Sequence, residues 1–414
     1  MGIALAILDG LVDVGQFIGK NALKIGKKGL PFAKKGMESL VEWISSHISD
    51  SRIDLKPINI SLVAPSGFGK TSLISTIMKE MDLTLQKTDK GRTYELNVRP
   101  KNKDDNKRLE ENNRIIVEAI TSGNGRISSV SIAGTGQCAS YNYEIALSMR
   151  NNKRELIQPF CMMDIPGGWI NPDNRTGIEA QKQWEEFEKH LHDSRILWIP
   201  IDSVALMEAR TSQEKEMRAK LMDITDVTQL ASEWAKYRAD DDESCICFVP
   251  LKCETYKLLS DNKEDSLIKE DFYKKFKEMF DNVMHEVNRV KGDSNIKLYY
   301  IPVETIGCIK KVSSNWERKD EKNVQFSADY GITGSHRAIK GADSLLYKVY
   351  EYANNQIEEM EKYDEQLLKA GSFKDKKKAK IALKNMKIAI KPLTDEFSKH
   401  IHDKNKLEEL VVQA

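Results

Sequence analysis

The segment "APSGFGKTS" (Ala64–Ser72) constrains the fold of this chain more than any other stretch. It satisfies the P-loop pattern, with alanine in place of the first glycine. The apolar run "INISLVAPS" before it is typical of a buried strand, and the pattern after it predicts a helix over 70–81. A glycine-rich turn between strand and helix binds phosphate through backbone N–H groups and the helix N-terminus. The segment therefore predicts a phosphate site in an α/β fold.

Each position of this loop has a predicted role. Gly67 and Gly69 let the backbone curl so that its N–H groups point at a phosphate. Lys70 is expected to reach the β- and γ-phosphates and to act in catalysis, and the Thr71 hydroxyl to ligate Mg²⁺. The residues predicted to bind the nucleotide here are Ser66, Gly67, Phe68, Gly69, Lys70, Thr71 and Ser72.

A second motif, "FCMMDIPGGW", runs from Phe160 to Trp169 and ends a strand-like run with an aspartate. A P-loop protein needs such a carboxylate beside the loop to hold Mg²⁺, so Asp164 is a predicted metal ligand and catalytic residue. In a D-x-x-G arrangement the Gly167 amide can bond the γ-phosphate, and the following loop responds to hydrolysis. ATPases of the chaperone-like and transporter classes usually place an acidic residue after this aspartate. Ile165 stands there, which favours a GTPase-type switch.

The remaining pattern alternates strands with helices, which predicts a doubly wound, mostly parallel sheet. An antiparallel hairpin is expected where "YNYEIALSM" and "ELIQPFCMMD" flank a polar turn. A helix is expected within 100–122, and "IKLYYIPVET" is expected to be the last strand. Further strands are predicted at "SRILWIPID" and "SCICFVPLK", and further helices at 204–238, at 265–290 and from 342 to the end.

Three regions follow from this pattern: an amphipathic helical arm (1–52), a P-loop GTPase-like domain (53–350) and a lysine-rich helical arm (351–414). The net charge is +1, so no global field points to nucleic acid, and no specific nucleic-acid partner is predicted. The six cysteines lack paired metal-site spacing and are expected to be reduced thiols. The first residues lack a basic leader, and no apolar run reaches membrane-spanning length. We therefore expect a cytoplasmic protein.

Residues 1–50 could bring this otherwise cytoplasmic protein to a membrane surface. Their apolar positions, mixed with six lysines between Lys20 and Lys35, form an imperfect amphipathic segment. Such a segment suits an anionic membrane surface or a protein partner, and the alternative is a helix packed back on the core. The lysine-rich stretch 374–391 could likewise bind an anionic surface or be a solvated helix face.

At this point the chain resembles the TRAFAC class of P-loop GTPases, and within it the bacterial double-GTPase-like branch found in predicted defence or conflict gene neighbourhoods. The resemblance covers about residues 55–350 and rests on two motifs and their layout. It implies GTP and Mg²⁺ as ligands and a protein partner or effector. The segments that carry it are "APSGFGKTS", the helix "RIIVEAITSGNGRISS", the hairpin, "MMDIPGG" and "DSRILWIPIDSVALM".

The resemblance also places a base-recognition motif, similar to [N/T]-K-x-D, in "CFVPLKCETY". It implies that Lys252 lays its aliphatic stem on the base and that Glu254 accepts hydrogen bonds from guanine N1 and N2. Leu251 replaces the polar residue that ties this loop to the P-loop. Thr305, in "VETIG", falls where a short backbone loop contacts the base carbonyl. The alternative is an ordinary loop at a strand end, which leaves guanine selectivity open.

Two parts of a GTPase switch are less defined. Thr135, between glycines in "IAGTGQCAS", is the predicted switch residue that reaches Mg²⁺, with Ser140 or a plain glycine-rich loop as alternatives. Gly168 stands where many related GTPases carry a water-orienting glutamine, so slow hydrolysis is expected unless another group assists. Conceivable helpers are Arg126, His190, His192, Arg210 or a partner's side chain.

Three functions are consistent with these patterns. The first is a GTP-binding molecular switch with slow or partner-stimulated hydrolysis, read through the terminal arms. The second is a P-loop ATPase or kinase-like protein, which predicts a preference for ATP. The third is a non-catalytic interaction module that nucleotide stabilises, which predicts no turnover.

Overall fold

The computed structural model describes residues 52–356, with gaps, and Glu408–Glu409. Both predicted arms lie mostly outside these described residues. At Glu408–Glu409, where we expected helix, the described backbone is a two-residue strand (β13) paired with β10 (Ile296–Tyr300). The gaps are 82–84, 90–91, 102–106, 122–125, 129–136, 150–151, 239–242, 292–295, 321–322, 335–338 and single positions near 108–119 and 343–354.

The larger sheet is mixed and has the strand order β13-β10-β9-β8-β2-β7-β6-β4-β3, with β1 also paired to β7. Strands β10, β9, β8, β2 and β7 are parallel to one another, whereas β6, β4 and β3 extend the sheet by antiparallel pairing. The predicted α/β fold with its antiparallel hairpin is therefore confirmed. The remaining strands of this sheet are β1 (Arg52–Asp54), β2 (Ile58–Leu62), β3 (Leu85–Asp89), β4 (Arg92–Pro100), β6 (Ala139–Met149), β7 (Asn152–Asp164), β8 (Ile196–Asp202) and β9 (Ser244–Leu251).

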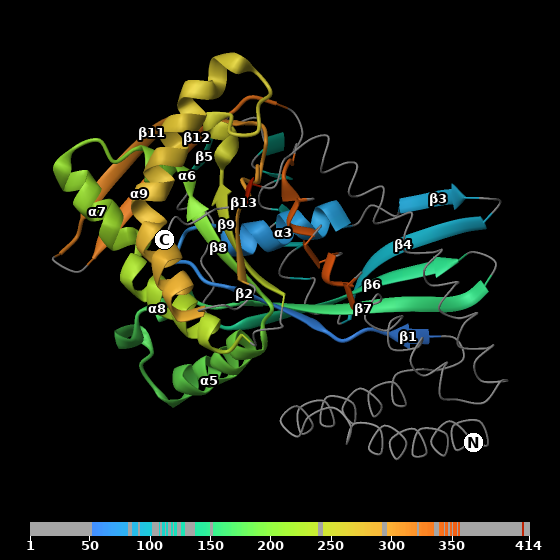
Figure 1. Cartoon of the computed structure of the whole chain (residues 1–414). Coiled ribbons are helices and arrows are strands. Elements are labelled where there is room, and N and C mark those ends of the chain that lie inside the picture. Colours follow the sequence, from blue (N-terminus) through green and yellow to red (C-terminus); the bar gives the residue numbers. More distant parts are fainter. Residues whose placement is uncertain are drawn as a thin grey trace.

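Helices cover both faces of the parallel strands (Figure 1). Every residue of β8 and β9 is buried, and alternate side chains enter two different hydrophobic clusters. One cluster includes α3 (Lys70–Met81) and the described helical positions after 341, and the other includes α5 (Ile178–Asp193), α8 (Ile224–Lys236) and α9 (Ser266–Lys291). Burial on both faces explains why these strands read as continuous apolar runs.

The order in which successive strands are added to the sheet switches from one side of β2 to the other. The strand β7 pairs with one side of β2, and the next strand, β8, pairs with the other. In open α/β sheets ligands bind outside the carboxyl ends of the strands at such a switch point. The P-loop leaves β2 at this point.

A second, three-stranded sheet has the order β11-β12-β5. The strands are β11 (Ile309–Arg318), β12 (Val324–Ile332) and β5 (Arg126–Ser128), all paired antiparallel. Two predictions are wrong here. "IKLYYIPVET" does not contain the last strand, and the predicted helix "RIIVEAITSGNGRISS" gives way to strand β5, although the described residues from 107 to 121 are helical.

Candidate functional site

The P-loop adopts the backbone shape that its glycines permit. Gly67 has φ +80° and Gly69 has φ +87°, in the left-handed region where other residues are strained. A Cβ at Gly67 would meet no described atom within 4 Å. Phe68 is 3% exposed and packs into the core, which anchors the loop between its two glycines. Ser66 and Gly67 are exposed, and Thr71 and Ser72 are half-buried.

The Lys70 side chain lies across its own loop. Its Nζ donates to the carbonyl oxygens of Ala64 at 2.8 Å and Pro65 at 3.2 Å. Burial lowers the pKa of Lys70, and the negative charge of Asp164 opposes this shift. The ammonium group is thus held beside the loop by two carbonyls and a nearby carboxylate, at the position from which phosphate contact is expected.

Thr71 and Asp164 meet although 93 residues separate them. Thr71 Oγ1 donates to Asp164 Oδ2 at 2.9 Å, and Asp164 is fully buried at the end of β7. A hydroxyl and a carboxylate are the oxygen ligands that Mg²⁺ accepts alongside substrate phosphates. Among the described residues, no group of three or more His, Cys, Asp or Glu side chains forms a metal site of its own. The pair therefore fits Mg²⁺ only as a shared site, with other oxygen atoms completing it.

Gly167 lies directly against the P-loop. A Cβ added to it would stand 2.1 Å from Ser66 N and 2.3 Å from Pro65 C, far inside contact distance. Only glycine fits this approach of two backbones. The D-x-x-G motif is therefore in contact with the loop that it was expected to serve.

The segment after Gly167 is compact. It forms two short turns, η2 (Gly167–Ile170) and η3 (Pro172–Asn174). Arg175 donates to the carbonyl oxygens of Trp169 at 2.7 Å and Ile170 at 2.9 Å, and its guanidinium lies 3.2 Å from the centre of the Trp184 ring. The sequence did not single out Arg175, because its partners are carbonyls that only the folded turn presents.

Three of the four conceivable water-orienting residues make other side-chain contacts. His190 Nε2 lies 3.1 Å from the Ile60 carbonyl, and His192 pairs with Glu233. Arg210 pairs with Glu208, and Arg126 lies on β5. These contacts do not single out any of the four as the residue that orients the attacking water.

Thr135 lies outside the described residues, but the chain just after it is anchored at the site. The Cys138 amide donates to Gln183 Oε1 of α5 at 3.1 Å, and Ala139 pairs with Asp164 across the hairpin. Burial, Asp164 and Glu186 raise the pKa of Cys138 to about 12, so this thiol is neutral. The alternative switch residue, Ser140, pairs with Met163 within the hairpin.

The predicted base loop also lies at this edge of the sheet. Lys252, with φ 57°, leads from β9 into η4 (Cys253–Tyr256). Glu254 Oε1 accepts from the amides of Ile306 at 3.0 Å and Gly307 at 3.1 Å, next to the buried Thr305. Burial raises the pKa of Glu254 even though these amides favour its charged form. Glu254 Oε2 is buried without a hydrogen-bond partner among the described residues.

Two details modify the sequence interpretation of this loop. Lys252 Nζ is bound to Asp202 Oδ2 at 2.5 Å, so its ammonium is already paired. Leu251 still connects the base loop to the P-loop, because its Cδ1 stands 3.3 Å from the position that a Cβ of Gly69 would take. An apolar contact thus replaces the expected polar tie.

Comparisons with known proteins add little to this geometry. No protein-family model matches the chain, and no curated protein matches it. Among solved structures, a bacterial dynamin GTPase, LeoA from ETEC, is similar at 11% identity with a TM-score of 0.28. The match covers 73% of this chain and only 37% of that one. A likeness at this level assigns no family or function. Any functional proposal therefore rests on the residues of this chain. No helix in the described part of the chain has the length and apolar character needed to span a membrane.

Proposed function

We propose that this protein binds GTP with Mg²⁺ and hydrolyses it slowly, as a molecular switch. The observation that supports it best is the close approach of Gly167 to Ser66, beside the Thr71–Asp164 hydrogen bond. A loop that cradles a phosphate and a glycine that packs against this loop, with an amide able to bond the same phosphate, are the two parts needed to sense a γ-phosphate. Such a device is useful to a switch.

The chain's own residues divide the work in this proposal. The backbone N–H groups of the P-loop and the Lys70 ammonium bind the phosphates, and Gly167 contributes its amide. Thr71 and Asp164, with Thr135 as a further ligand, would hold Mg²⁺, which neutralises charge on the phosphates when bound. Gly168 has no side chain with which to orient water, so turnover is slow without a partner.

Glu254 supports the preference for guanine. Its Oε2 is a buried acceptor that lacks a donor in the described residues. An unsatisfied buried acceptor is costly, and a purine with N–H groups at positions 1 and 2 satisfies it, whereas adenine offers no N–H at either position. Lys252 and the backbone at Thr305 complete the base site in this proposal.

The partners remain part of the proposal. A protein effector reads the nucleotide state, with the terminal arms as the contact regions and residues 1–50 as a peripheral membrane contact. A role in a bacterial defence or conflict system follows from the sequence resemblance alone. Nucleotide-dependent recruitment of the full-length chain to anionic vesicles, lost on removal of residues 1–50, tests the membrane part.

We expect Glu254→Ala to lower GTP affinity by about tenfold and to leave ATP affinity within about twofold, because a hydrogen bond to a charged group contributes roughly 1.5–3 kcal/mol. Competition of each nucleotide against a fluorescent GTP analogue measures both affinities. Glu304→Ala is the matched control, since Glu304 is a buried carboxylate in the segment after β10, and its backbone pairs with Lys340. Equal losses for GTP and ATP would contradict the assignment of Glu254.

Single-turnover hydrolysis of GTP by the wild-type protein then distinguishes a switch that hydrolyses GTP from a module that only binds it.

A further inference from the structure

The short helix α6 (Ser203–Met207) has a carboxylate at each end, and the first of these holds the base loop. Asp202 Oδ1 accepts from the amides of Val204 at 2.9 Å and Ala205 at 3.0 Å, which caps the helix. Asp202 Oδ2 binds Lys252 Nζ. One side chain therefore fixes both the start of α6 and the start of the base loop.

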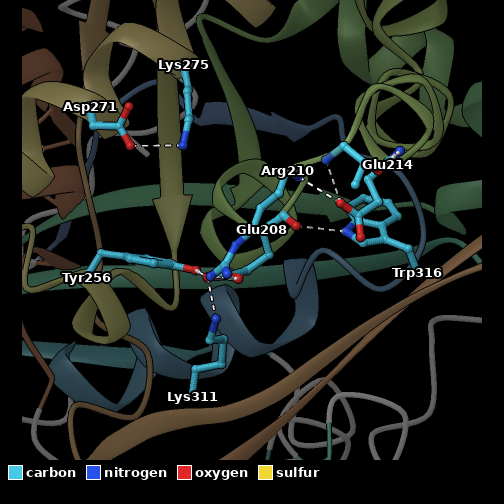
Figure 2. Close-up of polar contacts among 9 residues, drawn as sticks. Glu208, Arg210, Glu214, Tyr256, Asp271, Lys275, Lys311 and Trp316 are labelled. Carbon is cyan, nitrogen blue, oxygen red and sulfur yellow. Dashed lines mark hydrogen bonds and ion pairs between the residues drawn. The ribbon is translucent and has the colours of Figure 1, made fainter.

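The second carboxylate, Glu208, is the centre of a larger network (Figure 2). It is 8% exposed, and its Oε1 accepts from the Tyr256 hydroxyl at 2.8 Å and forms an ion pair with Lys311. Its Oε2 accepts from Arg210 Nη2 at 3.0 Å, and its backbone oxygen accepts from Trp316 Nε1 at 3.3 Å. Burial alone would raise the pKa of Glu208, but Lys311, Tyr256 and Arg210 bring it below its usual value. Glu208 is thus a charged anchor.

These contacts reach the two segments that flank Glu254, which are the turn η4 and the segment that leads from Gly307 into β11. Tyr256 ends η4, two residues after Glu254. Lys311 belongs to β11, which begins two residues after Gly307, one of the amides that hold Glu254 Oε1. Glu208 therefore links the turn that carries the base acceptor to the segment that orients it.

We propose that Glu208 is a positioning residue for base recognition, which aims Glu254 Oε2 by holding Tyr256 and Lys311. The inference rests on the proposed function, in which Glu254 receives the base. A buried charged group that fixes two segments loses both contacts when it is truncated, and the freed segments relax apart. The expected consequence is a loss of discrimination at the base, beyond any loss of stability.

The test compares GTP with inosine triphosphate, which lacks the 2-amino group but is otherwise the same ligand. Wild type, Glu208→Ala and Tyr256→Phe are titrated with each nucleotide in the presence of Mg²⁺. We expect Glu208→Ala to weaken GTP binding by about tenfold and inosine triphosphate binding by about threefold, so that their ratio falls. Tyr256→Phe, which removes one hydroxyl, shifts the ratio in the same direction by a smaller factor and keeps the test valid if Glu208→Ala does not fold.

Glu214→Ala is the matched control, because Glu214 lies in the same network but does not touch the base loop. It accepts from the amides of Arg210 and Thr211 in the capping box of α7 (Ser212–Met222). Its replacement lowers the melting temperature and leaves the nucleotide ratio unchanged. A ratio in Glu208→Ala and Tyr256→Phe equal to that of Glu214→Ala overturns the positioning role alone. A wild type that binds both nucleotides equally overturns the contact between Glu254 and the 2-amino group, and the positioning role with it, but leaves the N1 contact of the proposed function standing.

Discussion

Replacing Lys70 with alanine is expected to weaken GTP binding by about 100-fold and to abolish hydrolysis. The Lys70 ammonium is held beside the P-loop by the Ala64 and Pro65 carbonyls, ready to exchange these for phosphate oxygens. Two charge-assisted hydrogen bonds, at roughly 1.5 kcal/mol each or more, account for a loss of this size. Titration of labelled GTP into the variant measures it.

A second buried lysine controls for the loss of packing and buried charge. Lys348 is 4% exposed, pairs with Glu351 at 2.7 Å and lies 3.9 Å from the Tyr299 ring centre, outside the P-loop. We expect Lys348→Ala to lower the melting temperature and to leave GTP affinity near that of wild type. Undiminished GTP binding in Lys70→Ala would remove the P-loop from the account.

The second large effect is expected for Gly167→Ala. The added methyl would stand 2.1 Å from Ser66 N and 2.5 Å from Ser66 Cα, and both are backbone atoms of the P-loop. Either the loop or the D-x-x-G segment must move, at a cost of about 1–3 kcal/mol in the free energy of unfolding. Because the glycine amide is then displaced from the γ-phosphate, the affinity for GTP should fall towards that for GDP.

Gly168→Ala is the matched control for that substitution. Among the described residues, a Cβ at Gly168 would come within 4 Å of Asn174 Nδ2 alone, at 3.8 Å, which is an ordinary contact. We expect this variant to keep both the stability and the GTP/GDP affinity ratio of wild type. The two variants are compared by thermal unfolding and by nucleotide titration, and similar behaviour of both would contradict a specific contact at Gly167.

The sequence predicted which residues meet at the centre of the candidate site, because the signals there are local. The P-loop glycines, Lys70 and Thr71 are adjacent in the chain, and α3 has the predicted bounds. Asp164 was found because it ends a continuous apolar run, which is how a strand buried on both faces reads. Parallel strands bring such ends to one edge, so the meeting of Thr71 and Asp164 followed from fold class.

The second sheet was missed although part of it is visible in the sequence. In β12 the residues Val324, Phe326, Ala328 and Tyr330 alternate with polar ones, the pattern of a half-buried strand. By contrast, β5 has only three residues and is stabilised by pairing with β12, so no local signal marks it.

The network at Glu208 lay beyond sequence reasoning for a related reason. Its partners Tyr256, Lys311 and Trp316 are between 48 and 108 residues away, and their charges and hydroxyls look like ordinary surface chemistry. The same holds for Glu254, whose contact with the amides at 306 and 307 depends on how two strand ends are placed. These distances are set by how α6, η4 and β11 pack together in the folded chain.

The central claim is that a guanine nucleotide binds at the P-loop together with Mg²⁺. The most direct measurement is displacement of labelled GTP from the purified full-length chain by unlabelled GTP, GDP and ATP, with Mg²⁺ and with a chelator. We expect both GTP and GDP to displace the labelled GTP. ATP should compete at least tenfold more weakly, because adenine lacks the N–H donors that bond Glu254. The affinity for GTP should fall when Mg²⁺ is removed. Displacement by ATP at lower concentrations than GTP, or binding that does not respond to Mg²⁺, would contradict the account.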